Sequence, residues 1–368
     1  MEFRQLRLQQ FRNFAFLELD LKGKRHFLLG ENAQGKSNCL EALSLVTAMR
    51  SFRVRDWKAL TQAGCSDWQA RYDIKNGDDH GINCLELAVN SARKQIILDG
   101  DPLPRLADLL GRFPVVVFGS EDMQLLRCSP CERRRWLDLT FSLMDPSYFS
   151  ALLAFGKALS QRNRLLKNKA TDRELEAFEQ AMATPASKLV QTRIERTETL
   201  RKLAEEVYHL VAEGKEQPSL SYRPDCAFTE ADAFVEEWRK NRPGDRAIGS
   251  TRSGPHRDDL RIKVDDRPAR EYGSDGQQRA LVMALRFAQA RLWESVLNNT
   301  PVLLVDDVLG ELDPRRREAF WQLCPDNCQV IATGTESPPN NEHWQVHHVK
   351  AGTIETAQST RSRHPSDH

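Results

Sequence analysis

The sequence predicts a mixed α/β fold that carries an inserted α-helical domain. The first sign is the motif G-x-x-x-x-G-K-S at Gly30 to Ser37, which stands between a short apolar run and a helical pattern. The second is the apolar run Val302 to Val305, which ends in two aspartates. The third is residues 132 to 212, where glycine is almost absent and apolar side chains recur three and four positions apart.

The first third of the chain predicts strands around one helix. Residues 3–8 and 14–21 alternate apolar and polar side chains with a period of two, which predicts a hairpin. The run 26–29 predicts a strand, and the apolar positions after the glycine-rich motif predict a helix. Further alternation between residues 73 and 98 predicts antiparallel strands, and Val115 to Phe118 predicts a buried strand.

The middle of the chain predicts a helical arm. Its longest uninterrupted piece, residues 186–212, would be roughly 40 Å long at 1.5 Å per residue, which suits a short hairpin or bundle. Loops are expected at the helix breakers that follow, namely Pro218, Pro224, Pro243 and Gly244. Beyond them the patterns predict a strand at 260–264, a helix at 277–297, and strands at 302–305 and 330–332.

These patterns divide the chain into a split head and an inserted arm. We expect residues 1–118 to form the N-terminal part of the head and residues 119–245 to form the arm. Residues 246–356 would complete the head, and residues 357–368 are polar and predict a disordered tail.

The composition favours a cytoplasmic, water-soluble protein. Lys and Arg total 53 against 52 Asp and Glu, so any surface for nucleic acid must be local. No stretch is long and apolar enough to predict export or membrane insertion. The 8 cysteines lack the density of a disulfide scaffold, and a zinc site joining Cys128 and Cys131 to Cys324 and Cys328 lacks histidine partners.

The glycine-rich motif matches the Walker A pattern in the expected strand–loop–helix context. Its backbone N–H groups would surround the β-phosphate of ATP, Lys36 would reach the β- and γ-phosphates, and the Ser37 hydroxyl would bind Mg²⁺. The predicted nucleotide-binding residues are Gly30, Glu31, Asn32, Ala33, Gln34, Gly35, Lys36 and Ser37.

The two aspartates predict the catalytic end of a buried strand, where ligand sites of parallel sheets lie. Asp306 would hold Mg²⁺ through a water molecule, and Asp307 would polarise the water that attacks ATP. Asp307 and Lys36, which reaches the β- and γ-phosphates, are the predicted catalytic residues. ATPases of the ABC type commonly carry glutamate at the second position. Because aspartate is one methylene shorter, we expect a slow ATPase.

The spacing of these motifs predicts an ABC-type head. Asp306 follows Lys36 by 270 residues, which leaves room for a whole inserted domain. About thirty residues before the acidic strand, Gly273 to Gln278 resembles the ABC signature motif. Ser274, Gly276 and Gln277 would then contact the γ-phosphate of ATP bound to a second subunit, although Ser274 and Gln277 also form a capping box. Asp313 lies where such ATPases place their D-loop.

Two other positions stay open. The usual switch histidine is absent after the strand at 330–332, which leaves Thr333, Thr335 or Glu336 to sense the γ-phosphate. Gln124 is a candidate Q-loop glutamine, but a solvated loop residue is the alternative.

Four segments resemble the RecF family in particular. They are Leu8 to Phe14, Gln161 to Lys167, Gly254 to Leu260, and the signature Gly276-Gln277-Gln278, and the match spans residues 1 to about 355. The resemblance implies a recombinational-repair protein that forms a homodimer on ATP and binds double-stranded or gapped DNA. It also implies that the protein acts with RecO and RecR to help load RecA.

Clustered cations provide candidate contacts for DNA phosphates. The candidates are Arg133, Arg134, Arg135, Arg162, Arg164 and Lys167, although such clusters are often only solvated helix faces. Alternative functions are a Rad50- or SMC-like DNA tether and a transporter ATPase subunit. The short arm disfavours the first, and the absent switch histidine with the large insertion disfavours the second.

Overall fold

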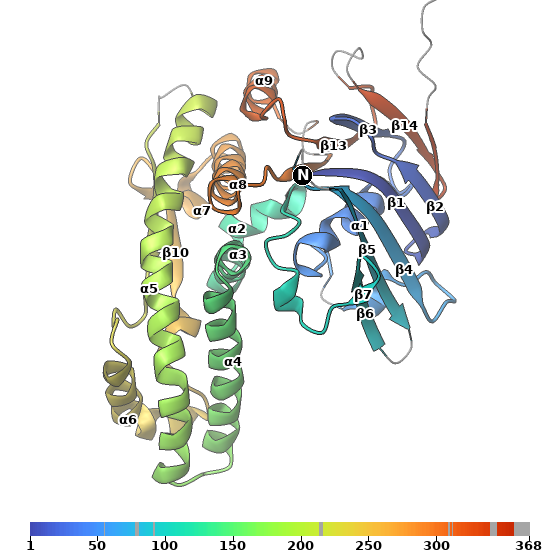
Figure 1. Cartoon of the computed structure of the whole chain (residues 1–368). Helices are drawn as coiled ribbons and strands as arrows, with labels where there is room; N and C mark the ends of the chain where they lie inside the picture. Colours follow the sequence, from blue (N-terminus) through green and yellow to red (C-terminus); the bar gives the residue numbers. More distant parts are fainter. Residues whose placement is uncertain are drawn as a thin grey trace, which may run out of the picture.

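The computed structural model describes residues 1–54, 56–77, 81–90, 93–212, 216–307, 310, 312–338 and 344–356. Figure 1 shows two lobes: one is built from sheets around α1, and the other is mainly helical. The strands are β1 (Glu2–Phe11), β2 (Phe14–Asp20), β3 (Arg25–Leu29), β4 (Trp68–Lys75), β5 (Ile82–Asn90), β6 (Arg93–Leu98), β7 (Asp101–Pro102), β8 (Val115–Gly119), β9 (Pro218–Arg223), β10 (Asp259–Val264), β11 (Arg267–Pro268), β12 (Val302–Asp306), β13 (Val330–Gly334), β14 (Gln345–Lys350) and β15 (Thr353–Thr356). The α-helices are α1 (Lys36–Ala48), α2 (Gln124–Arg127), α3 (Pro130–Met144), α4 (Pro146–Lys167), α5 (Asp172–Val211), α6 (Ala231–Ile248), α7 (Ala269–Tyr272), α8 (Asp275–Leu297) and α9 (Pro314–Leu323).

The sheet lobe places α1 between two six-stranded sheets. One sheet has the order β2-β1-β4-β5-β6-β7 and is antiparallel throughout, which confirms the predicted hairpin and the strands after it. The other has the order β15-β14-β3-β13-β12-β8, in which the pairs from β14 to β8 are parallel. The apolar face of each sheet packs on α1, which is buried over most of its length. The helix is therefore held firmly where it leaves the glycine-rich loop.

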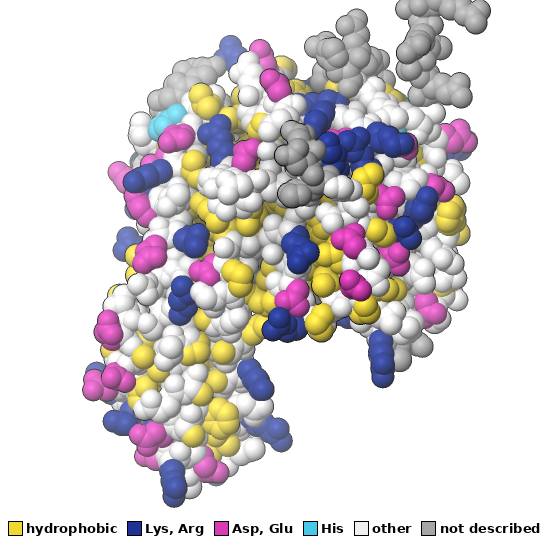
Figure 2. Space-filling model, viewed as in Figure 1, with side chains coloured by type: hydrophobic (Ala, Val, Ile, Leu, Met, Phe, Trp, Pro, Cys, Tyr) yellow, Lys and Arg dark blue, Asp and Glu magenta, His cyan; other side chains and the backbone are white. Residues whose placement is uncertain are grey.

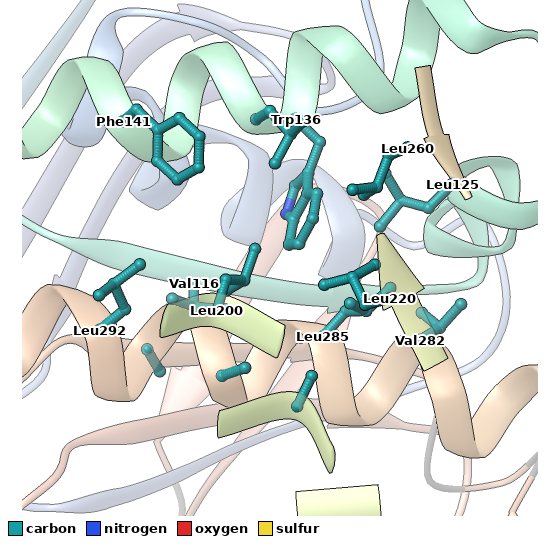
Figure 3. Packing of buried hydrophobic residues seen from close by; sticks show 14 of the residues in the cluster. Val116, Leu125, Trp136, Phe141, Leu200, Leu220, Leu260, Val282, Leu285 and Leu292 are labelled. Atoms are coloured by element: carbon teal, nitrogen blue, oxygen red, sulfur yellow. The ribbon is translucent and has the colours of Figure 1, made fainter. Parts of the chain in front are cut away.

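The helical lobe packs α3, α4, α5, α6 and α8 around a second core. Figure 3 shows Trp136 and Phe141 of α3 and Leu285 of α8 meeting near Val116 of β8. This core therefore joins the helical lobe to the edge strand of the parallel sheet. The short sheet β11-β10-β9 covers α5 and α3 on the same lobe.

Two expectations about the arm are wrong. Helix α5 has 40 residues and passes through Pro185, so it is longer than the predicted piece 186–212. Residues on both sides of the proline are buried, among them Met182, Ala183 and Ala186, and this packing outweighs the lost hydrogen bond. Pro243 and Gly244 also lie within a helix, α6, rather than in a loop.

The predicted domain boundaries at residues 118 and 245 stay predictions. The second boundary falls within α6, and the pairing of β9 with β10 joins residues from both sides of it. Helix α8, which follows this boundary, packs against α5 in the helical lobe. The predicted disordered tail, 357–368, lies outside the described residues.

No helix in the described part of the chain combines the length and apolar character that crossing a membrane requires.

Candidate nucleotide site

The glycine-rich loop joins β3 to α1 and is shaped by contacts that only glycine allows. Gly35 has a φ of 121°, and a methyl group on it would lie 2.6 Å from Nδ2 of Asn13. A methyl group on Gly30 would collide with the carbonyl of Val349. No acidic side chain occupies the first turn of α1, so its N-terminal N–H groups suit an anion.

The ammonium group of Lys36 lies against its own loop. Its Nζ donates hydrogen bonds to the carbonyls of Gly30 at 2.7 Å and Glu31 at 2.8 Å. Glu31, Asn32 and Ala33 are exposed at the apex of the loop. The ammonium group therefore already lies beside the loop. Its N–H groups now donate to the two carbonyls, and the oxygens of a bound phosphate could accept these hydrogen bonds instead.

Ser37 and Asp306 meet although they lie far apart in the sequence. The Ser37 hydroxyl donates to Oδ1 of Asp306 at 2.8 Å, and the Thr333 hydroxyl donates to the same oxygen at 3.1 Å. The Thr333 oxygen also accepts the backbone N–H of Asp307 at 3.0 Å. Sheet order explains this geometry, because β13 lies between β3 and β12 and carries Thr333 one residue before its end.

This cluster has the chemistry of a magnesium site. Hydroxyl and carboxylate oxygens are the ligands that Mg²⁺ prefers, and Ser37 and Asp306 supply one of each beside the loop. Burial raises the pKa of Asp306, while the hydrogen bonds from Ser37 and Thr333 lower it. A bound cation would favour the charged carboxylate in the same way as these donors.

Asp307 has a left-handed backbone conformation, with a φ of 56°. This turn directs the chain away from β12 immediately after Asp306. Of the three candidate γ-phosphate sensors, only Thr333 contacts both aspartates in the described structure. Thr335 and Glu336 are exposed just beyond it, and their roles stay predictions.

Sequence reasoning missed Asn13, which supports the loop from outside. Its Nδ2 donates to the Gln34 carbonyl at 2.9 Å, and its Oδ1 accepts from Asn38 of α1 at 2.8 Å. The turn after β14 holds the same loop residue, because the Ala351 N–H donates to Oε1 of Gln34 at 2.7 Å. Asn13 lies within Leu8 to Phe14, one of the segments that resemble the RecF family, but that resemblance did not indicate a contact with the glycine-rich loop.

Sequence reasoning also missed Glu121, which follows β8. Burial raises the pKa of Glu121, Arg53 lowers it, and the nearby charges of Glu41 and Asp306 raise it further. Strand β8 pairs with β12 so that Gly119 lies opposite Asp306. An acid after an apolar strand was the signal that identified Asp306, and it would have identified Glu121 as well. Gln124 is exposed at the start of α2, and its Q-loop role stays a prediction.

The signature segment begins α8 in the lobe opposite α1 (Figure 1). Ser274 and Gln277 form the capping box, with Ser274 N–H to Oε1 at 2.8 Å and Gln277 N–H to Oγ at 3.2 Å. Asp275 is paired with Arg127, and Gln277 donates to Glu216 at 3.0 Å. The capping role is therefore present, while the role toward a second subunit stays a prediction.

Asp313 begins α9 as its N-cap residue. Its Oδ1 accepts the backbone N–H of Arg316 at 3.0 Å, and its Oδ2 accepts from Nη1 of Arg316 at 2.8 Å. The neighbouring Glu311 of the predicted D-loop lies outside the described residues, as do Val308 and Leu309.

The structure corrects two of the six candidate DNA contacts. Arg162 is fully buried and binds the carboxylates of Glu179 and Asp245. Arg133 is also buried, and it pairs with Asp259. The Arg162 side chain has no exposed area and that of Arg133 is only 10% exposed, so both guanidinium groups bind internal carboxylates rather than face a DNA phosphate in this conformation.

Of the other four candidates, Arg134 and Arg135 are half-buried and bound within the chain, whereas the remaining two are exposed. Arg134 donates to the carbonyl of Asp258 at 2.6 Å, and Arg135 pairs with Glu132 at 2.5 Å. Arg164 and Lys167 are exposed on α4. Figure 2 shows that cations are interleaved with acidic side chains on the face in view, so no single basic stripe marks a DNA surface there.

The cysteine pairs have ordinary structural positions. Cys324 and Cys328 are buried, and burial raises the pKa of both thiols, that of Cys328 to about 11. Among the described residues, no group of three or more His, Cys, Asp or Glu side chains is arranged to hold a metal ion.

The two lobes, the glycine-rich loop and the acidic strand end define a P-loop ATPase head of the ABC type. The Smc head domain from Pyrococcus furiosus shares this fold, with a TM-score of 0.56 at 14% identity over 97% of this chain and 96% of that chain.

The chain belongs to the RecF family of DNA replication and repair proteins. It is 34% identical over 372 residues to the RecF protein of Synechococcus sp. (strain JA-2-3B'a(2-13)), covering 96% of this chain and 97% of that protein. It is 33% identical over 349 residues to RecF of Halalkalibacterium halodurans, covering 91% and 93% of the two chains. No protein-family model matches the chain.

Solved structures support the same assignment. The recombination mediator protein RecF of the RecFOR pathway, solved with ATP, matches with a TM-score of 0.90 and 27% identity over 97% of this chain and 98% of that chain. The family predicted from the four sequence segments is thus confirmed, and neither a tether nor a transporter subunit is needed to explain the fold.

Proposed function

We propose that this chain binds ATP with Mg²⁺, forms a homodimer on it, and hydrolyses it slowly as a conformational switch. The observation that supports this most directly is the convergence of Ser37, Asp306 and Thr333 beside the glycine-rich loop. The RecF protein solved with ATP, whose fold this chain shares, supports the choice of nucleotide.

Each residue has a defined part in the proposal. Lys36 would exchange the carbonyls of Gly30 and Glu31 for β- and γ-phosphate oxygens, and Ser37 and Asp306 would hold the cation. Mg²⁺, when bound, neutralises charge on the β- and γ-phosphates. Asp307, whose N–H is fixed by Thr333, would orient and polarise the attacking water.

A second copy would complete the site. Ser274, Gly276 and Gln277 lie in the lobe opposite α1 within one chain, so they would serve the γ-phosphate held by the partner, with Asp313 beside them. The resulting dimer would bind duplex or gapped DNA in the cytoplasm, with Arg134, Arg135, Arg164 and Lys167 as remaining candidates. Together with RecO and RecR it would help load RecA, in line with the RecFOR pathway of the RecF protein it matches.

Two variants test the nucleotide site. Lys36→Ala should weaken ATP binding in calorimetry by about tenfold or more, because it removes a charged donor to phosphate. Asp307→Asn should bind ATP and Mg²⁺ normally, lose turnover, and accumulate dimers in sedimentation, since asparagine tolerates the left-handed backbone at this position. Unchanged ATP affinity in the first variant, or wild-type turnover in the second, would refute the proposal.

A further inference from the structure

Arg316 of α9 lies directly on the signature turn of α8. A methyl group on Gly276 would lie 2.5 Å from Nη1 of Arg316 and 3.2 Å from its Cζ and Nη2. The guanidinium group therefore rests on the glycine at the N-terminus of α8. This contact joins the D-loop region to the signature motif within one chain.

The orientation of this guanidinium group is fixed by Asp313. The Asp313 side chain accepts from both the backbone N–H and Nη1 of Arg316. The Nε atom of Arg316 is buried and has no hydrogen-bond partner within the described residues. The side chain of Arg316 as a whole is 26% exposed, so part of it remains accessible from outside the chain.

Two positive groups thus meet at one point on the surface. The N-terminus of a helix carries the positive end of its dipole, and the guanidinium group of Arg316 lies there as the cationic half of its ion pair with Asp313. Nearby acids are already paired: Asp275 with Arg127, and Glu216 with Tyr208 and Gln277. Such an arrangement favours an anion that approaches from outside the chain, and a guanidinium edge suits phosphate oxygens.

We propose that Arg316 binds the γ-phosphate of ATP held by a second copy of this chain, beside the signature motif. The inference rests on the proposed function, because it requires the nucleotide to lie between two copies. Asp313 would keep the guanidinium group on Gly276 before the partner arrives. The signature turn offers only neutral backbone N–H donors to the γ-phosphate, and Arg316 would add a positively charged donor beside them.

Arg316→Gln and Arg316→Ala test the assignment, with Arg315→Ala as a control for charge on the same helix turn. Both Arg316 variants should raise the dimer dissociation constant with ATP by about 10- to 100-fold in sedimentation, and turnover should fall with dimerisation. ATP affinity of the monomer, measured below the dimerisation concentration, should not change. Arg315→Ala should dimerise like wild type, and Arg316→Lys should recover part of the dimer.

The outcomes separate this inference from the proposed function. If the wild-type chain forms no dimer with ATP, the proposed function fails. If wild type dimerises and Arg316→Gln dimerises equally well, only the assignment of Arg316 is overturned. A fall in thermal stability or in monomer ATP affinity for both Arg316 variants would also overturn it, because it would show a structural role within one chain.

Discussion

Thr333 connects the two aspartates that follow β12. Its hydroxyl donates to the carboxylate of Asp306 and its oxygen accepts from the backbone N–H of Asp307, so one small side chain holds the first carboxylate and the backbone of the second aspartate. A histidine is the usual residue after this strand in ABC-type heads. A threonine can polarise the site through hydrogen bonds but cannot carry a proton to or from the γ-phosphate at neutral pH.

Thr333→Val keeps the shape of the side chain and removes the hydroxyl. We expect turnover, measured as phosphate release, to fall about tenfold, because a part-buried N–H loses its partner at a cost of about 1–3 kcal/mol. ATP affinity should stay within about twofold. Wild-type turnover of Thr333→Val would remove Thr333 from the site.

At the scale of elements, a buried ionic network fixes the helices of the arm. Arg162 of α4 binds Glu179 of α5 at 2.9 Å and Asp245 of α6 at 2.8 Å, and all three side chains are fully buried. Arg242 of α6 adds a second cation to Glu179. The segment Gln161 to Lys167, which resembles the RecF family, therefore contributes to the internal structure of the arm.

Arg162→Ala should destabilise the protein by about 3–5 kcal/mol, because it leaves two carboxylates buried without their main cation. Urea unfolding followed by circular dichroism measures this loss. Arg164→Ala, two positions along the same helix but exposed, should change stability by less than about 0.5 kcal/mol. Similar losses in the two variants would contradict the structural role of Arg162.

Two histidines join β3 to β14 at the edge of the parallel sheet. Nδ1 of His26 lies 3.1 Å from Nε2 of His347, and both rings are buried. Burial lowers the pKa of His26, and burial with the neighbouring His26 lowers the pKa of His347 to about 4. Both rings are therefore neutral in the folded protein at physiological pH.

This pair predicts that acid weakens the sheet. Below about pH 6.5 His347 becomes protonated in the unfolded chain, whereas in the folded protein it stays neutral until about pH 4. The contribution of His347 to the free energy of unfolding is therefore complete above this window and is lost as the pH falls through it. The loss due to His347 should be about 3 kcal/mol. In urea unfolding between pH 7 and 4, His347→Gln should lose less stability than wild type. The exposed His348 is the control, and a His348→Gln curve as flat as that of His347→Gln would contradict the assignment.

At the scale of the whole molecule, the proposed function assigns complementary halves of one nucleotide site to the two lobes. The sheet lobe carries the glycine-rich loop and Asp306, and the helical lobe carries the signature turn of α8. If the proposed function holds, one chain would bind ATP at the first surface and contact the partner's ATP at the second, which lies at a different place on the molecule. Two chains related by a twofold axis can satisfy both surfaces at once.

Ser274→Arg should block this pairing. The bulky side chain would fill the space for the opposing γ-phosphate, so ATP-driven dimers should be lost in sedimentation while monomers still bind ATP. Because joined copies present more cations to DNA, wild type with ATP should show a steeper dependence of DNA affinity on salt than the variant. If Ser274→Arg dimerises as well as wild type, or if DNA affinity does not depend on nucleotide, Ser274 acts only as a helix cap.

Local sequence patterns were enough to predict the chemistry of the site and most of the helices and strands. The glycine-rich loop, the acidic end of β12, the strands with a period of two and the start of α8 all follow from patterns within a few residues of one another. Such patterns are formed by residues that are neighbours along the chain. The RecF family could be predicted for the same reason, because the four segments that resemble it are short and continuous.

The contacts between residues far apart in the sequence became known from the folded chain. It brought the hydroxyls of Ser37 and Thr333 to the same oxygen of Asp306, carried α5 through Pro185, and buried Arg162 against partners 17 and 83 positions away in the sequence. The physical reason is that an arginine has the same charge whether its partner is water, DNA or a buried carboxylate. The order of strands and the packing of helices determine which partner it meets, and no local pattern contains that information.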